Sequence, residues 1–130
     1  MILLDTHVLV WWVAEPERLS AKARRAIAGD GAEGILVSSI SAWEIGMLVK
    51  KGRLKLSMNV RSWLALTERL PRVRYRPVTN EIALASALLP AAAPRDPADG
   101  IIIATAMAEE IPLVTADARI RKCRLVRTVW

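Results

Sequence analysis

The sequence predicts an α/β fold built around a mainly parallel sheet with crossover helices. Two observations support this fold class: short apolar runs that resemble strands alternate with helical patterns, and acidic residues stand where strands end or helices begin. A chain of 130 residues, 53% of them hydrophobic, is long and apolar enough to bury a real core. We therefore expect one domain over residues 1–130.

The expected strands are short apolar runs bounded by polar residues or turn residues. The first is buried, and the last is expected to lie at an edge of the sheet. In chain order they cover residues 1–4, 35–38, 73–78, 113–115 and 125–129.

The expected helices follow these strands and carry recognisable start and stop signals. Ser20 suits an N-cap, Ser41 would begin the third helix, Gly52 would end it, and either Thr79 or Asn80 caps the fifth. Asp96 opens the sixth helix, and a turn runs from Asp117 through residue 120. The predicted helices cover residues 7–14, 21–28, 43–51, 59–70, 80–89 and 97–109.

The chain carries a formal net charge of +6, and fourteen of its nineteen cationic residues are arginines. The cations concentrate in residues 69–76 and 119–127. This balance favours an anionic partner such as nucleic acid, because arginine forms two-pronged bonds with phosphate. The alternative, which composition alone does not exclude, is a solvated surface that keeps the protein in solution.

Four acidic motifs stand out against this basic background, and they contain four of the five aspartates. Because parallel strands all end on the same side of a sheet, acids that follow strands should collect along one edge. The motifs are Leu4-Asp5-Thr6, Ser41-Ala42-Trp43-Glu44-Ile45, Asp96-Pro97-Ala98-Asp99-Gly100 and Leu113-Val114-Thr115-Ala116-Asp117.

Helix capping explains each acid taken singly. Asp5 and Asp117 stand at helix or turn starts, Ser41 with Glu44 matches a capping box, and Asp96 precedes a proline and an acid at the third helical position. Capping does not require acids at all of these sites, however, since Ser, Thr or Asn serve equally well. The set as a whole therefore indicates a site.

Converged carboxylates need a counter-charge, because two of them about 5 Å apart repel by roughly 3 kcal/mol at an effective dielectric of 20. A divalent cation meets this need, and oxygen ligands without a Cys or His cluster select Mg²⁺, with Mn²⁺ as the alternative. Such a site holds a phosphate and orients an attacking water. The acids and the basic surface together predict phosphodiester hydrolysis.

The four motifs, in this order and over essentially the whole chain, resemble PIN-domain ribonucleases, and more narrowly the VapC-type toxins of toxin-antitoxin pairs. The resemblance implies a three-layer α/β/α PIN-like domain, Mg²⁺- or Mn²⁺-dependent cleavage of RNA, homodimerisation and inhibition by a cognate antitoxin protein. A housekeeping nuclease of the same family remains an alternative.

Carried over residue by residue, the resemblance implies the catalytic set Asp5, Glu44, Asp99 and Asp117. Asp5 and Asp99 would bind the metal directly, and the other two would complete the site by outer-sphere contacts or by aligning water. Three further residues are possible supporting residues: Thr6, Thr115 and Asp96. We expect Asp96 mainly to cap its helix.

Gly100 departs from the family pattern, which often has an arginine directly after this acid. A cation that would pair with a carboxylate or phosphate is therefore missing, and another arginine would have to replace it. The glycine also costs up to about 1 kcal/mol relative to alanine in a helix.

The remaining polar and aromatic residues are interpreted as structural. His7 and Cys123 are not expected to take part in the chemistry, and the tryptophans at 11, 12, 43 and 63 are expected to pack rather than stack on bases. The apolar start is interrupted by Asp5, and residues 101–108 are too short to span a bilayer, so we expect a cytoplasmic protein without membrane contact.

Three rivals belong to other functional classes. A non-catalytic module that binds nucleic acid or a partner through its basic surface would need no metal. An aspartyl-phosphate phosphatase would want a second aspartate where His7 stands, and a receiver domain would want an adjacent acidic pair.

Overall fold

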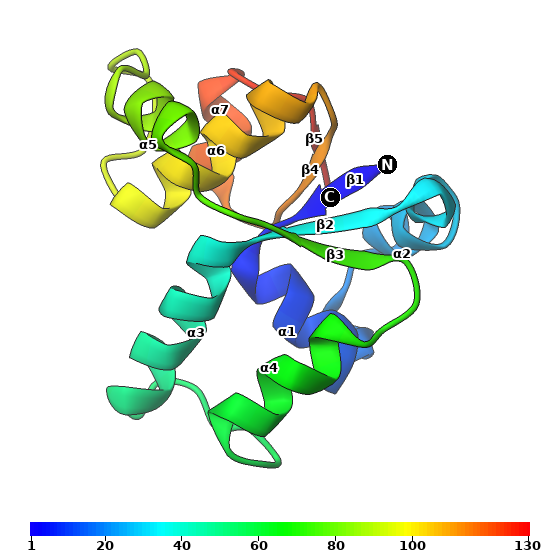
Figure 1. Cartoon of the computed structure of the whole chain (residues 1–130). Helices are drawn as coiled ribbons and strands as arrows, with labels where there is room; N and C mark the ends of the chain where they lie inside the picture. Colours follow the sequence, from blue (N-terminus) through cyan, green and yellow to red (C-terminus); the bar gives the residue numbers. More distant parts are fainter.

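A parallel sheet forms the centre of the computed structural model, which describes residues 1–130 except for the side chains of residues 31 and 32. In the described chain, five strands lie in the order β3-β2-β1-β4-β5, and every neighbouring pair is parallel (Figure 1). The strands are β1 (Ile2–Leu4), β2 (Ile35–Ser38), β3 (Val73–Arg76), β4 (Leu113–Val114) and β5 (Thr128–Val129).

Helices cover both faces of this sheet, with α1 to α4 on one side and α5 to α7 on the other (Figure 1). The predicted three-layer α/β/α class is therefore confirmed. The helices are α1 (Thr6–Ala14), α2 (Ala21–Ala28), α3 (Ser39–Lys50), α4 (Val60–Glu68), α5 (Asn80–Ala87), α6 (Pro97–Glu109) and α7 (Ala118–Cys123). Short 3₁₀ turns at Pro16–Arg18 and Asp30–Glu33 flank α2.

The central strand β1 divides the core into two apolar clusters, because successive side chains of a strand point to opposite faces. Ile2 and Leu4 belong to the cluster under α1 to α4, where Trp63 is also buried. Leu3 faces the other side and packs in the cluster that contains Ile102 and Ile103 of α6. With both faces covered, β1 has no polar side chain until it ends at Asp5.

Most of the predicted caps are confirmed. The side chains of Asp5, Ser20, Thr79, Asp96 and Asp117 each accept a backbone N–H at the start of a helix. Gly52 follows the end of α3 with φ of +70°, the left-handed conformation that glycine adopts without strain. The residues after Asp117 form the short helix α7 and not just a turn.

The predicted capping box of Ser41 and Glu44 is wrong. Helix α3 begins at Ser39, four residues before the predicted helix, because the Ser38 hydroxyl accepts the N–H of Ile40 and caps it instead. Ser41 therefore lies inside the first turn and is completely buried. This shift leaves Ser41 and Glu44 available for contacts with other elements.

Two strands, β3 and β5, are shorter than predicted by two residues or more. β3 ends at Arg76 because the next residue, Pro77, has no N–H to donate to the sheet. β5 is an edge strand as expected, but it begins at Thr128, since Leu125 and Val126 pack against the core cluster of α6 instead of pairing with β4. Among the described residues, no helix is long and apolar enough to cross a membrane.

The core packing predicts a large effect of Ile103→Ala, because Ile103 is completely buried between α6 and the sheet. We expect the free energy of unfolding to fall by about 3 kcal/mol in urea denaturation, as for other buried aliphatic truncations. Leu66→Ala is the matched control, since this α4 side chain is 44% exposed and should change stability by about 0.5 kcal/mol or less. Equal losses in the two variants would contradict the assigned core.

Candidate active site

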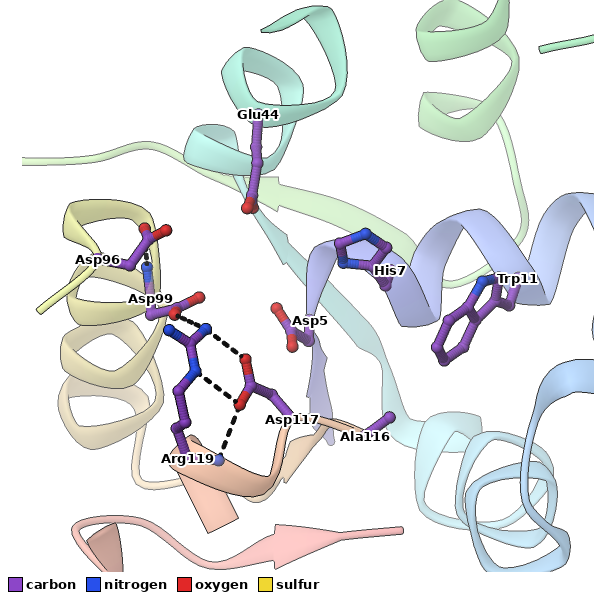
Figure 2. Close-up of a pocket in the computed structure, with 9 residues that line it drawn as sticks. All are labelled: Asp5, His7, Trp11, Glu44, Asp96, Asp99, Ala116, Asp117 and Arg119. Carbon is purple, nitrogen blue, oxygen red and sulfur yellow. Dashed lines mark hydrogen bonds and ion pairs between the residues drawn. The ribbon is translucent and has the colours of Figure 1, made fainter. Parts of the chain in front are cut away.

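A cavity of about 410 Å³ opens where the strands β1 and β4 end, and the predicted acids all line it (Figure 2). Asp5 follows β1, Glu44 projects from α3, Asp96 and Asp99 lie at the start of α6, and Asp117 precedes α7. The complete lining is Asp5, His7, Trp11, Glu44, Asp96, Asp99, Ala116, Asp117 and Arg119. The structure thus brings together five carboxylates from four separate parts of the chain.

Asp5 is only 7% exposed, and hydrogen bonds hold both of its carboxylate oxygens in place. One carboxylate oxygen accepts the backbone N–H of Thr6 at 2.8 Å, and the other accepts the hydroxyl of Thr115 at 2.6 Å. Burial raises the pKa of Asp5, and these two hydrogen bonds act against that rise by stabilising the charged form. Thr115, one of the predicted supporting residues, therefore lies in contact with Asp5.

Thr115 also couples two acidic positions. Its hydroxyl oxygen accepts the backbone N–H of Asp117 at 3.0 Å while its proton is donated to Asp5. The ends of β1 and β4 are thereby fixed relative to each other, because one buried hydroxyl bonds to both.

Glu44 is oriented by two hydroxyl groups in series. The Thr6 hydroxyl donates to the carboxylate of Glu44 at 2.5 Å, and the Thr6 and Ser41 hydroxyl oxygens are 2.8 Å apart. Since the Thr6 O–H donates its hydrogen bond to Glu44, the Ser41 hydroxyl must be the donor in the second bond. Partial burial raises the pKa of Glu44. Sequence reasoning did not assign this role to Ser41, because it placed that serine at a helix cap.

The two acids at the start of α6 have different environments. Asp96 is exposed, and one of its oxygens accepts the N–H groups of Ala98 and Asp99, as expected for a residue that caps the helix. Asp99 is only 6% exposed. Burial, followed by repulsion from Asp96, Asp5 and Asp117, raises the pKa of Asp99 to about 7.

Arg119 is the cation of this cavity, and the sequence prediction missed it. Its guanidinium lies 3.0 Å from Asp99 and 2.8 Å from Asp117, so one group bridges two acids (Figure 2). Hydrogen bonds from Arg119 lower the pKa of Asp117. The signal was present in the sequence, since Gly100 left a position for a cation and an arginine follows Asp117 by two residues.

Position 100 has room for a residue larger than glycine. A Cβ added there would meet the backbone oxygen of Ser86 at 3.8 Å, which is ordinary van der Waals contact. The cation expected after Asp99 is instead supplied across the cavity from α7.

The residues that line the cavity are suitable ligands for a hard divalent cation, because they offer carboxylate oxygens and no cysteine. In the side-chain positions of the described residues, no three His, Cys, Asp or Glu groups converge closely enough to hold one ion. The guanidinium of Arg119 stands between Asp99 and Asp117, so an ion bound by both of these carboxylates would have to displace it.

The tryptophans have different environments. Trp63 is 2% exposed, as expected for a packing residue, and Trp11 and Trp12 pack against the same cluster while remaining partly exposed. Trp43 is 58% exposed, so it does not pack in the core. Trp11 additionally lines the acidic cavity, and its ring lies beside that of His7 at 5.9 Å.

The fold and the acidic cavity together define a class of protein. Comparison with known sequences identifies this class. The model of the PIN domain matches residues 2–124, and the chain belongs to the PIN-domain family. It is 41% identical over 131 residues to ribonuclease VapC22 of Mycobacterium tuberculosis, an alignment that covers 99% of this chain and 98% of that protein. The resemblance read from the four motifs is confirmed.

Solved structures share this fold at low sequence identity. VapC20 of Mycobacterium tuberculosis, described as a sarcin-ricin loop cleaving toxin, superimposes with a TM-score of 0.67 and 16% identity over 97% of each chain. A chain of VapBC2 from Rickettsia felis, solved on a promoter DNA fragment, gives 0.66 and 17% over 98% of this chain and 97% of that one. FitAcB from Neisseria gonorrhoeae gives 0.61 and 24%, covering 98% and 96%.

The raised pKa of Asp99 predicts a pH-dependent stability of the protein in EDTA. The folded state holds this proton up to about pH 7, whereas an unfolded aspartate releases it near 3.8. Stability is therefore greatest below that lower value and falls as pH rises through about 7. Asp99→Asn should reduce this slope, leaving the smaller part due to Asp5 and Glu44, whose pKa values burial also raises. The variant should be on the order of 2 kcal/mol more stable than wild type at pH 8.

Urea denaturation in EDTA at a series of pH values measures this slope. Glu68→Gln is the control, because Glu68 is exposed at the end of α4 and does not line the cavity. The assignment fails if Asp99→Asn and Glu68→Gln show the same pH profile.

Proposed function

We propose that this protein is a Mg²⁺-dependent endoribonuclease and the toxin of a type II toxin-antitoxin pair. The observation that carries the proposal is the convergence of five carboxylates on one cavity at the carboxyl ends of parallel strands. A relative that is 41% identical over nearly the whole chain is named a ribonuclease, which supports RNA as the substrate.

Asp5 and Asp99 are the proposed metal ligands, because both are buried and border the same cavity. Mg²⁺, or Mn²⁺ in its place, would neutralise the phosphate and favour attack of water on phosphorus. Thr115 and the Thr6 N–H hold the Asp5 carboxylate in place. Glu44 and Asp117 would complete the site by outer-sphere contacts or by aligning water.

Proton transfer would involve the chain's own carboxylates. Hydrolysis adds water across a P–O bond, so one group must accept a proton from the attacking water and the departing oxygen must take up a proton from an acidic group or from solvent. Glu44 has a raised pKa and is aimed into the cavity by Thr6, which supports its role beside the attacking water.

An antitoxin and a second copy of this chain are the proposed protein partners. Several structures with this fold are toxin-antitoxin complexes, including the complex from Klebsiella pneumoniae and FitAB, which supports an antitoxin partner. Leu88 and Met107 are exposed and line an apolar cavity between α5 and α6, and Leu84 of α5 is exposed as well, which supports a dimer contact there.

The proposal is tested with purified protein free of antitoxin. We expect cleavage of RNA with Mg²⁺ or Mn²⁺, no cleavage in EDTA, and a loss of more than about 100-fold in Asp5→Asn and Asp99→Asn, beyond that typical of outer-shell groups. Glu68→Gln should cleave at the wild-type rate. Cleavage by both aspartate variants at the wild-type rate would show that the assigned site is wrong.

The rival functions give other results. A non-catalytic module would bind nucleic acid equally well in EDTA and after loss of the carboxylates, without cleavage. A housekeeping nuclease would cleave RNA without arresting growth when induced alone, whereas a toxin should arrest growth and its Asp5→Asn variant should not.

Arg119 should compete with the metal, because its guanidinium bridges Asp99 and Asp117. Calorimetric titration with Mn²⁺ should give about fivefold tighter binding to Arg119→Ala than to wild type, equivalent to the roughly 1 kcal/mol of a partly exposed ion pair. Arg124→Ala, an exposed arginine beyond α7, is the control. Unchanged or weaker binding would contradict this role of Arg119.

A further inference from the structure

A second polar cavity of about 400 Å³ lies between α2, α7 and β5. Four cationic side chains from three parts of the chain line it, and Asp30 is the one acidic side chain among its described lining residues. The cations are Lys22, Arg25, Arg121 and Arg127. All four are exposed, so their charges are available to a ligand from solvent.

An aromatic pair connects this basic cavity with the acidic one. Trp130 lines the basic cavity, and Trp11 lines the acidic cavity. Their ring centroids are 5.8 Å apart with the planes at 52°, so the two cavities meet at this pair. Both rings are partly exposed, and the Arg18 guanidinium lies 4.7 Å from the Trp11 ring.

Helix α7 makes a second connection along its own surface. Its first turn carries Asp117 and Arg119 at the acidic cavity, and Arg121 lies about half a turn further on, in the basic cavity. A shallow hollow beside it is lined by Arg121, Lys122 and Arg124. Cationic side chains of α7 therefore extend from the acidic cavity to the basic one, and α7 itself contains no Asp or Glu.

This arrangement fits a single-stranded nucleic acid. Such a ligand needs cations spaced along its phosphates and aromatic faces for its bases, and the cavity with the Trp11–Trp130 pair offers both. Arginine also suits phosphate through two-pronged hydrogen bonds. An acidic protein segment would use the cations but has no need of two partly exposed indole rings beside them.

We propose that the surface formed by Lys22, Arg25, Arg121, Arg127 and the Trp11–Trp130 pair binds the nucleotides that flank the scissile phosphate of single-stranded RNA. This inference rests on the proposed ribonuclease function for the identity of the ligand. The surface binds the flanking strand whether or not a metal is present, because its own cations supply the attraction.

The test measures binding without cleavage. A fluorescein-labelled single-stranded RNA of about twelve nucleotides is titrated in EDTA, and its anisotropy is followed at several salt concentrations. Arg25→Ala combined with Arg121→Ala should weaken binding about tenfold at low ionic strength. The slope of log K against log salt should fall by about 1.4, since each phosphate contact to a single strand contributes about 0.7.

Lys50→Ala combined with Lys51→Ala is the matched control. It also removes two exposed charges, but at the end of α3 that leads away from the sheet (Figure 1). This variant should keep the wild-type slope. Equal slopes for the two double variants would overturn the proposal, because any attraction would then come from net charge alone.

Two further arms separate the alternatives. If the arginine variant binds RNA as wild type does but loses a fluorescent oligoglutamate peptide, the surface takes an acidic protein segment and the proposal fails. If wild type does not cleave RNA with Mg²⁺, yet only the arginine variant loses RNA affinity, the ribonuclease function fails while the binding surface stands.

Discussion

The burial of β1 at the centre of the sheet is the constraint on which the rest of the structure depends. β2 and β4 pair with the two edges of β1, and helices cover both of its faces, so Ile2–Leu4 is buried and the chain turns polar only at Asp5. That carboxylate is therefore placed among buried groups and needs hydrogen-bond donors. The Thr6 N–H and the Thr115 hydroxyl provide them, and the Thr115 bond fixes the end of β4 against the end of β1.

The same geometry concentrates charge that the protein must then balance. Asp99 is partly protonated near neutral pH, Asp117 is stabilised by Arg119, and Asp5 and Glu44 accept hydrogen bonds from threonine hydroxyls. Each of these four carboxyl groups is thus partly protonated, paired with a cation or hydrogen-bonded to a hydroxyl group. An acidic cavity of this kind is tolerated because part of its formal charge is neutralised before any ligand arrives.

The fold and the positions of the acids were predictable because they depend on local patterns. Apolar runs, caps such as Asp96, and the rule that parallel strands end together placed every predicted acid on one cavity. The exceptions depended on tertiary contacts that one sequence does not display. Ser41 is drawn to Thr6 rather than to a helix cap, Arg119 reaches Asp99 from another helix, and Trp43 is left on the surface.

The three aspartates that cap helices also determine how the cavity looks to an approaching anion. Helices α1, α6 and α7 all begin at its rim, with Asp5, Asp96 and Asp117 as their N-caps. Each helix start carries a partial positive charge of up to about half a unit, so the backbone offsets part of the charge of the carboxylates that cap it. A phosphate group that enters therefore meets a field less negative than the five acids alone suggest.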